Sequence, residues 1–352
     1  MRKLILLVLC FAPLLPALAQ MTSAALPSLP KDAQEVFAAA APFYNFSDPS
    51  LKPWHLKATY QLYDEKGNPA EQGTYEYWWA SPQIYRSTWT RPSATHTDWH
   101  TADGKHAYDS SGEAIKFFEY KLQEALLSPL PEADDLDPAK VRLDRQSISE
   151  NGTRFPCFML VPQMPQHGQL QVVPLGLFPT YCFNPQIPAL QVSYSFGTVT
   201  MALNKIVTMQ EKFIPRQIQL AEGKRLILSA TVDSITNLNP GNPALIPTPS
   251  AHKNLEKVAV SAGVAVGFLL KKQEPVYPQD AKDARVSGRV VLQAIIGTDG
   301  AVHNLRVIST PWPSLAASAL WSVSQWEYKP YLLKGDPVEV ETTINVIYTL
   351  GN

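Results

Sequence analysis

Apolar residues recur at every second position in two segments near the C-terminal end of the chain. In the first segment these positions hold Val286, Gly288, Val290, Leu292, Ala294 and Ile296. In the second segment they hold Val338, Val340, Thr342, Ile344, Val346, Tyr348 and Leu350. Successive side chains of a strand point to opposite faces, so a period of two predicts strands with one face on a core.

The residues between these segments complete a small unit. Asp299-Gly300 predicts a tight hairpin turn, because glycine adopts positive φ without steric cost, and residues 302–308 form the return strand. Ser314 is a candidate N-cap. A helical stripe follows it, made of Leu315, Ala319, Leu320, Val323 and Trp326. We therefore expect a helix packed on a three-stranded antiparallel sheet.

Residues 54–237 show the same alternation in many short segments. We predict helices in residues 27–41 and 115–127. The predicted strands are residues 55–63, 73–80, 84–90, 96–100, 106–108, 155–161, 170–173, 180–183, 190–196, 205–213, 215–220 and 225–234. Successive amphipathic strands with one or two helices predict a single curved antiparallel sheet, resembling a half-barrel. The whole chain is therefore assigned to the α+β class.

The start of the chain has the pattern of a secretory leader. A basic start precedes an apolar run, and Ala17-Leu-Ala19 is a small-residue cleavage pattern, so residues 1–19 are predicted to be a cleavable signal peptide. An uncleaved leader acting as a membrane anchor is the alternative. We predict an N-terminal domain in residues 20–237, a proline-rich linker in residues 238–257 and a C-terminal domain in residues 258–352.

Composition excludes some classes of partner. The net charge of −1 gives no electrostatic footprint for nucleic acid, so neither DNA nor RNA is an expected partner. Once the leader is removed, two cysteines remain, Cys157 and Cys182. In an oxidising compartment they are candidates for a disulfide, with two buried thiols as the alternative.

Few residues suggest catalysis. His96, His100 and His106 are the only clustered ligands of the kind that zinc prefers, but exposed histidines of a strand and turn are the commoner explanation. No nucleophile elbow, phosphate-binding loop or dinucleotide fingerprint occurs. We therefore expect no enzyme activity, no metal site and no cofactor.

The C-terminal segment resembles the C-terminal domain of the TonB energy-transducer family. The matching residues are Pro275-Val-Tyr-Pro278, Gly288-Arg-Val290-Val-Leu292, Asp299-Gly300, Val307-Ile-Ser309, Trp326-Glu-Tyr328-Lys329-Pro330 and Gly335-Asp-Pro-Val338. They occur in the family's order and spacing. One departure is Thr310, where the family usually has glycine.

The resemblance implies a periplasmic binding module without chemistry of its own. Such domains bind a short segment, the TonB box, of an outer-membrane TonB-dependent transporter by adding it as a strand to an exposed sheet edge. The last strand, residues 338–350, is the expected edge. The candidate partner-binding residues are Gln325, Tyr328, Lys329, Glu341, Thr343 and Asn345. These domains also pair through their edge strands, so a homodimer is a second use of the same edge.

The N-terminal domain is similar, through generic motifs, to LolA-like periplasmic lipoprotein carriers. The similarity lies in Gly73-Thr-Tyr-Glu-Tyr-Trp-Trp79 and in Pro82-Gln-Ile-Tyr-Arg86. A concave face lined by Tyr77, Trp79 and Trp89 would hold a hydrophobic ligand, whereas the structural alternative is that these rings fill the core. The sequence thus leaves three functions: a TonB-like binding module, a soluble carrier of a lipid or hydrophobic molecule, and a structural envelope protein.

Overall fold

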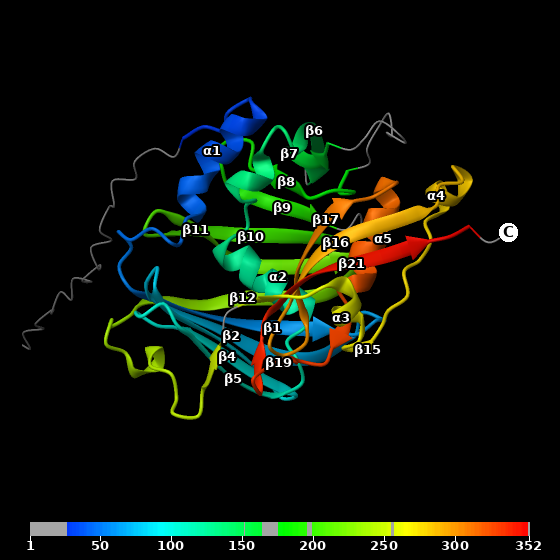
Figure 1. The fold of residues 1–352 in the computed structure, drawn as a ribbon. Helices are drawn as coiled ribbons and strands as arrows, with labels where there is room; N and C mark the ends of the chain where they lie inside the picture. Colours follow the sequence, from blue (N-terminus) through cyan, green and yellow to red (C-terminus); the bar gives the residue numbers. More distant parts are fainter. Residues whose placement is uncertain (1–26, 151, 164–174, 196–198, 255–256, 351–352) are drawn as a thin grey trace, which may run out of the picture.

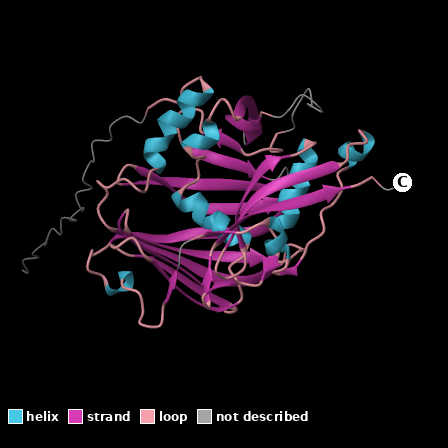
Figure 2. Cartoon of the chain, in the orientation of Figure 1, coloured by secondary structure: helices cyan, strands magenta, loops and turns pink. Residues whose placement is uncertain are grey.

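The computed structural model describes residues 27–150, 152–163, 175–195, 199–254 and 257–350. The predicted leader and the predicted strand 170–173 lie outside the described residues. Most of the described chain is strand, arranged as one large curved sheet and one smaller sheet (Figures 1 and 2). This agrees with the predicted fold class.

Within the described residues the large sheet is antiparallel throughout, with thirteen strands in the order β13-β5-β4-β3-β2-β1-β12-β11-β10-β9-β8-β7-β6. Its strands are β1 (Trp54–Tyr63), β2 (Pro69–Ser81), β3 (Ile84–Arg91), β4 (Ala94–His100), β5 (His106–Gly112), β6 (Val141–Glu150), β7 (Thr153–Pro162), β8 (Thr180–Phe183), β9 (Leu190–Ser195), β10 (Val199–Met209), β11 (Lys212–Glu222), β12 (Arg225–Asn237) and β13 (His252–Asn254).

Two helices cover the inner face of this sheet. The alternate buried residues of β1 and β2 point to that face, as the alternation predicts. Helix α1 (Ala33–Tyr44) begins where the Asp32 carboxylate accepts hydrogen bonds from the Gln34 and Glu35 amides. Helix α2 (Phe117–Leu127) lies inside the curve of the sheet, beneath the smaller sheet (Figure 1).

Three details differ from the sequence-based expectation. Residues 205–213 are not one strand, because the chain turns at Gln210 and Glu211, where φ is 48° and 65°. Glycine usually marks such a turn, and neither of these residues is glycine, so the local sequence did not predict the turn. Strand β6 was not predicted, and α1 continues past Pro42 to Tyr44.

The smaller sheet has the order β14-β21-β16-β17. Its strands are β14 (Val258–Ala259), β16 (Gly288–Ile296), β17 (Val302–Ser309) and β21 (Val340–Tyr348). The three long strands are antiparallel as predicted, and β14 adds a short parallel fourth strand. Helix α5 (Pro313–Val323) packs on one face. Its N-cap is Trp312 rather than the expected Ser314.

Shorter elements surround this unit. They are η1 (Ala133–Leu136), η2 (Pro243–Leu245), α3 (Ala262–Val266), β15 (Leu269–Lys271), α4 (Gln279–Asp283), β18 (Glu327–Tyr328), β19 (Tyr331–Leu333) and β20 (Asp336–Val338). Strand β15 pairs with β18, and β19 pairs with β20.

The segment predicted to be a linker packs along the large sheet. The Ala244 carbonyl accepts a hydrogen bond from Trp99 Nε1 at 3.0 Å and another from the Arg86 guanidinium at 3.3 Å. Leu245 is buried, and β13 pairs with β5. Residues 238–254 are therefore part of the folded body rather than a free spacer.

The smaller sheet packs directly on the N-terminal part. Phe118 of α2 lies against Trp321 of α5, with ring centroids 5.4 Å apart, and Arg306 of β17 is 3.8 Å from the Asp135 carboxylate. Buried apolar residues of both parts belong to one continuous cluster. Helix α2 thus contributes side chains to the hydrophobic cores of both sheets.

Candidate protein-binding edge

The outer edge of β21 carries backbone groups that point away from the sheet. Strand β21 pairs with β16 on one side, from Val340 to Tyr348. On the other side, the carbonyls of Glu339 and Glu341 accept hydrogen bonds from β14. Backbone N–H and C=O groups of alternate residues point to the same edge of a strand. The next outward-facing residues are therefore Thr343, Asn345 and Ile347.

Within the described chain, the strand pairings leave these three residues without a neighbour on the outer side. Their side chains are exposed, and Ile347 is 65% exposed. The intervening residues Thr342, Ile344 and Val346 are buried against the helix side of the sheet. The predicted edge is therefore present, but β14 occupies its start, which the sequence-based interpretation did not anticipate.

Three of the predicted partner-binding residues lie on this strand. Thr343 and Asn345 are exposed on the solvent face of the sheet. Glu341 is half-buried, and its carboxylate accepts a hydrogen bond from the Gln293 amide. The Gln293 carbonyl oxygen in turn accepts from Arg306 at 2.6 Å. The polar row across the sheet ends at Glu341, beside the outward-facing part of β21.

The other three predicted residues lie after α5 and in or next to β18, and among them only Tyr328 is buried by the rest of the chain. Tyr328 is 4% exposed and pairs with Leu269 of β15. The Lys329 amide donates to the Phe268 carbonyl at 2.7 Å, and the Gln325 side-chain amide donates to the Trp321 carbonyl at 3.1 Å. Burial raises the pKa of Tyr328 above its ordinary value. Tyr328 thus contributes to the core, whereas the Lys329 side chain is exposed.

The aromatic residues predicted to line a ligand cavity are packed. Tyr77, Trp79 and Trp89 are 8%, 2% and 0% exposed. The Trp89 ring lies 4.2 Å from that of Tyr75 and 6.3 Å from that of Tyr120 of α2, measured between centroids. In this structure all three rings belong to the main hydrophobic core.

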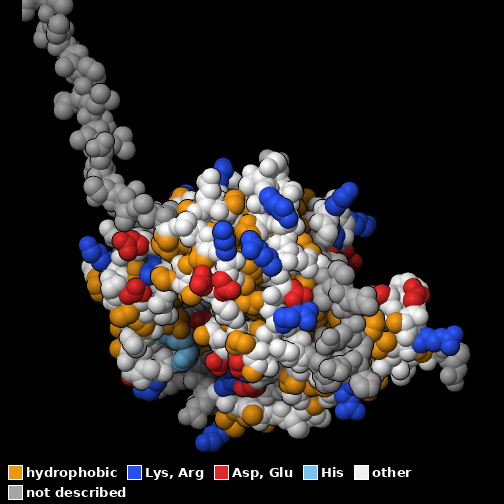
Figure 3. Space-filling view, turned by 90° about the horizontal axis from the view of Figure 1, so that it is seen from above, with side chains coloured by type: hydrophobic (Ala, Val, Ile, Leu, Met, Phe, Trp, Pro, Cys, Tyr) orange, Lys and Arg blue, Asp and Glu red, His pale blue; other side chains and the backbone are white. Residues whose placement is uncertain are grey.

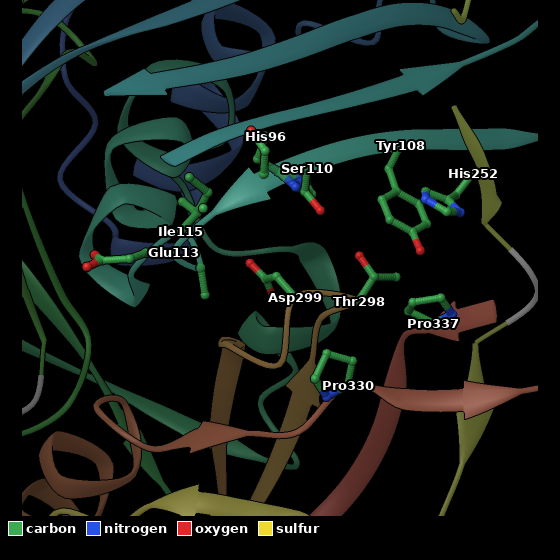
Figure 4. Close-up of a pocket in the computed structure, with 13 residues that line it drawn as sticks. His96, Tyr108, Ser110, Glu113, Ile115, His252, Thr298, Asp299, Pro330 and Pro337 are labelled. Carbon is green, nitrogen blue, oxygen red and sulfur yellow. The ribbon is translucent and has the colours of Figure 1, made fainter. Parts of the chain in front are cut away.

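A pocket of about 310 Å³ lies between the two parts of the molecule (Figure 4). The large sheet contributes His96, Tyr108 and Ser110, and the hairpin between β16 and β17 contributes Thr298 and Asp299. His96 Nδ1 and the Tyr108 hydroxyl are buried and have no hydrogen-bond partner among the described residues. A small polar molecule or ordered water in this pocket would therefore meet both groups.

Two histidine–aspartate pairs lie beside the pocket. His96 Nε2 is 2.8 Å from the Asp98 carboxylate. Although burial alone would lower it, the pKa of His96 is raised to about 9 by Asp98, with smaller effects of Asp299 and Asp109. Asp299 is 3.0 Å from His303. Burial alone would raise its pKa, yet His303 lowers the pKa of Asp299 to about 2. The His96–Asp98 pair is therefore ionic at neutral pH, and Asp299 is held as the carboxylate.

The remaining predictions concern cysteine and metal chemistry. Cys157 of β7 lies directly opposite Cys182 of β8, and the structure joins them in a disulfide. His100 and His106 face each other across β4 and β5 with ring centroids 3.6 Å apart, whereas His96 pairs with Asp98. Among the described residues, no group of three or more His, Cys, Asp or Glu side chains is arranged to hold a metal ion.

Comparison with known proteins identifies the smaller unit. Residues 273–350 match the family model of the Gram-negative bacterial TonB protein C-terminal domain. The resemblance recognised from the sequence is thereby confirmed for this segment, which we call the TonB-like domain. The match begins after β15, so β14, α3 and β15 lie outside it. No curated protein matches the sequence.

Two of the solved structures found by comparison each align with about three fifths of this chain. The LolA superfamily protein NE2245 from Nitrosomonas europaea is 8% identical, with a TM-score of 0.37, covering 61% of this chain and 97% of its own. A DUF1329 family protein from Desulfovibrio piger is 8% identical, with a TM-score of 0.37, covering 60% of this chain and 98% of its own.

The longest helix of the described residues, α1, has 12 residues, so none of these helices could cross a bilayer. A spanning helix needs about 20. The face in Figure 3 mixes acidic and basic side chains without a large patch of one sign.

Proposed function

We propose that this protein is a periplasmic binding protein whose TonB-like domain takes up an extended segment of an outer-membrane TonB-dependent transporter at the edge of β21. The observation that carries the proposal is the outward-facing backbone of Thr343, Asn345 and Ile347. An added strand satisfies such groups and draws its affinity from main-chain hydrogen bonds. This mode needs no catalytic residue.

The edge suits a transient partner. An unpaired strand edge is a template for any extended chain, and natural proteins restrict such edges. Here the free stretch is short, and the exposed side chains beside it are mostly polar, with Ile347 as an apolar exception. Selective binding of one segment would then depend on its fit to the side chains of Thr343, Asn345 and Ile347.

The test removes one outward-facing donor. Proline is tolerated on an edge strand where its missing N–H faces solvent. Asn345→Pro should therefore leave the pairing with β16 intact and weaken binding of a synthetic TonB-box peptide about tenfold, since one lost hydrogen bond is worth about 1 kcal/mol and the adjacent backbone is also blocked. Asn345→Ala keeps the donor and is the matched control.

Isothermal titration of the full chain after signal-peptide removal reads out this comparison. Equal affinities of the two variants would contradict backbone-directed binding. Sedimentation of the protein at the titration concentration checks whether a second copy competes for the same edge, since a homodimer would use the same donors.

A further inference from the structure

Strand β14 already binds the edge of β21 in the way expected of a partner segment. The Val258 amide donates to the Glu339 carbonyl at 2.9 Å, and the Val260 amide donates to the Glu341 carbonyl at 3.0 Å. The two strands run parallel, with Val258 opposite Val340. These bonds are the backbone contacts of strand addition, made within one chain.

The side chains of this segment alternate as well. Ala259 is exposed, whereas Val260 packs against the main core. Val260 also lines a shallow groove between α3 and the sheet, together with Ala265, Phe268, Ile296, Tyr328 and Val340. This part of the edge therefore holds a short parallel strand with apolar side chains at alternate positions, Val258 and Val260, of which Val260 lies in the groove.

We propose that residues 258–260 are a built-in competitor for the partner's strand. The edge takes an extended segment that runs parallel to β21 and carries apolar side chains at alternate positions. It opens fully only when β14 leaves. The inference rests on the proposed function and concerns its regulation. With β14 in place, a partner meets the outward groups of Thr343, Asn345 and Ile347; without it, those of Glu339 and Glu341 as well.

The contacts of β14 are few enough for exchange. Only two residues are paired, and both side chains of the pair are at least partly exposed. Its neighbours hold the segment nearby, because Ala265 of α3 is buried and β15 pairs with β18. A tethered strand of this kind competes through its high effective concentration and not through strong contacts.

The first experiment uses a synthetic peptide with the sequence of residues 257–262, Lys-Val-Ala-Val-Ser-Ala. It is titrated into the full chain and into the variant Val258→Pro/Val260→Pro, which lacks both donors to β21. Ala259→Pro is the matched control, because the Ala259 amide lies between the two donors and points away from β21. The readout is the shift of the Glu341 and Thr343 amide signals.

We expect the double variant to bind the peptide at least about tenfold more tightly than the unmodified chain, since removing a competitor raises the fraction of open edge. The Ala259→Pro variant should match the unmodified chain. Equal binding by all three proteins would overturn the inference. Amide exchange in the unmodified chain is a check that needs no substitution: Glu341 should be protected, and exchange as fast as in an unpaired strand would also overturn it.

A second titration separates this inference from the proposed function. If TonB-box peptides bind the unmodified chain and the double variant equally, the function stands and the competitor is refuted. If TonB-box peptides bind neither protein while the 257–262 peptide binds the double variant, the cis-strand inference stands and the proposed partner is wrong.

Discussion

The Tyr120 ring of α2 packs against the His303 ring of β17, with centroids 3.9 Å apart and the ring planes tilted by 37°. The Tyr120 hydroxyl donates to the Asp299 carboxylate at 3.4 Å. Tyr120 belongs to the N-terminal part of the chain, and His303 and Asp299 belong to the TonB-like domain. One side chain therefore joins the two parts by an aromatic contact and a polar contact.

Substituting Tyr120 tests this junction. Tyr120→Ala removes both contacts and should lower the free energy of unfolding by about 2–3 kcal/mol, because the ring is only partly exposed. Tyr120→Phe keeps the ring and should cost about 1 kcal/mol or less. Chemical denaturation measures both values. If the two variants have the same free energy of unfolding, the contact of the Tyr120 ring does not stabilise the junction.

The His96 pair predicts a loss of stability at alkaline pH. The folded pKa of about 9 lies above the ordinary value of 6.5. The stabilisation is therefore fully present below pH 6.5 and is lost as the pH rises through 9. His96→Gln should flatten the stability profile between these values, whereas His106→Gln, an exposed residue of the same hairpin, should not. Denaturation midpoints of the unmodified chain and the two variants, measured from pH 6 to 9.5, check this prediction. If the midpoints of all three proteins fall in parallel, the His96 pair is not the cause of the loss.

We expect substitution of Arg91 to destabilise the N-terminal part strongly. Its side chain is fully buried and lies 2.8 Å from Glu71 and 3.3 Å from Glu119, whose side chain is also buried. Arg91→Met would leave the Glu119 charge uncompensated, so we expect a loss of about 3–5 kcal/mol. Glu113→Gln is the control, because Glu113 is 62% exposed and should matter little. A loss below about 1 kcal/mol in Arg91→Met, measured by urea unfolding, would contradict a stabilising role of the buried Arg91–Glu119 pair.

We expect the disulfide to make a measurable contribution to the free energy of unfolding, because it closes a loop of the chain. Cys157 and Cys182 are separated by 25 residues in sequence. A cross-link of this span stabilises a fold by about 3 kcal/mol in the chain-entropy account. Cys157→Ala/Cys182→Ala should unfold at correspondingly lower denaturant concentration, and reducing agent should shift the unmodified chain but not the variant. If the reductant lowered the stability of both proteins equally, its effect would not arise from the Cys157–Cys182 disulfide.

Alternation along the chain was sufficient to predict most strands, because each strand buries one face. Residues 55–63 and 288–296 could be read in this way. Strand β6 could not, because none of its residues is buried and its apolar positions are few. The hairpin turn at Gln210 and Glu211 also lacks glycine, so tertiary pairing rather than local composition fixes it.

The candidate site was predictable only in part. The alternation of Thr343 and Asn345 with buried residues placed them on an exposed face, and the structure agrees with that placement. Tyr328 was predicted to contact a partner, yet β15 covers it, and pairing between distant segments leaves no trace in a single sequence. The contact of Asp299 with Tyr120 was missed for the same reason, since Asp299-Gly300 also fits an ordinary hairpin turn.

The measurement that most directly tests the account is a titration of the chain without its predicted signal peptide with TonB-box peptides, followed by backbone amide shifts. The account predicts that the amides of Thr343, Asn345 and Ile347 shift together and become protected from exchange, while those of β17 on the opposite edge do not. If no amide of β21 responds at millimolar peptide, strand addition at this edge is wrong.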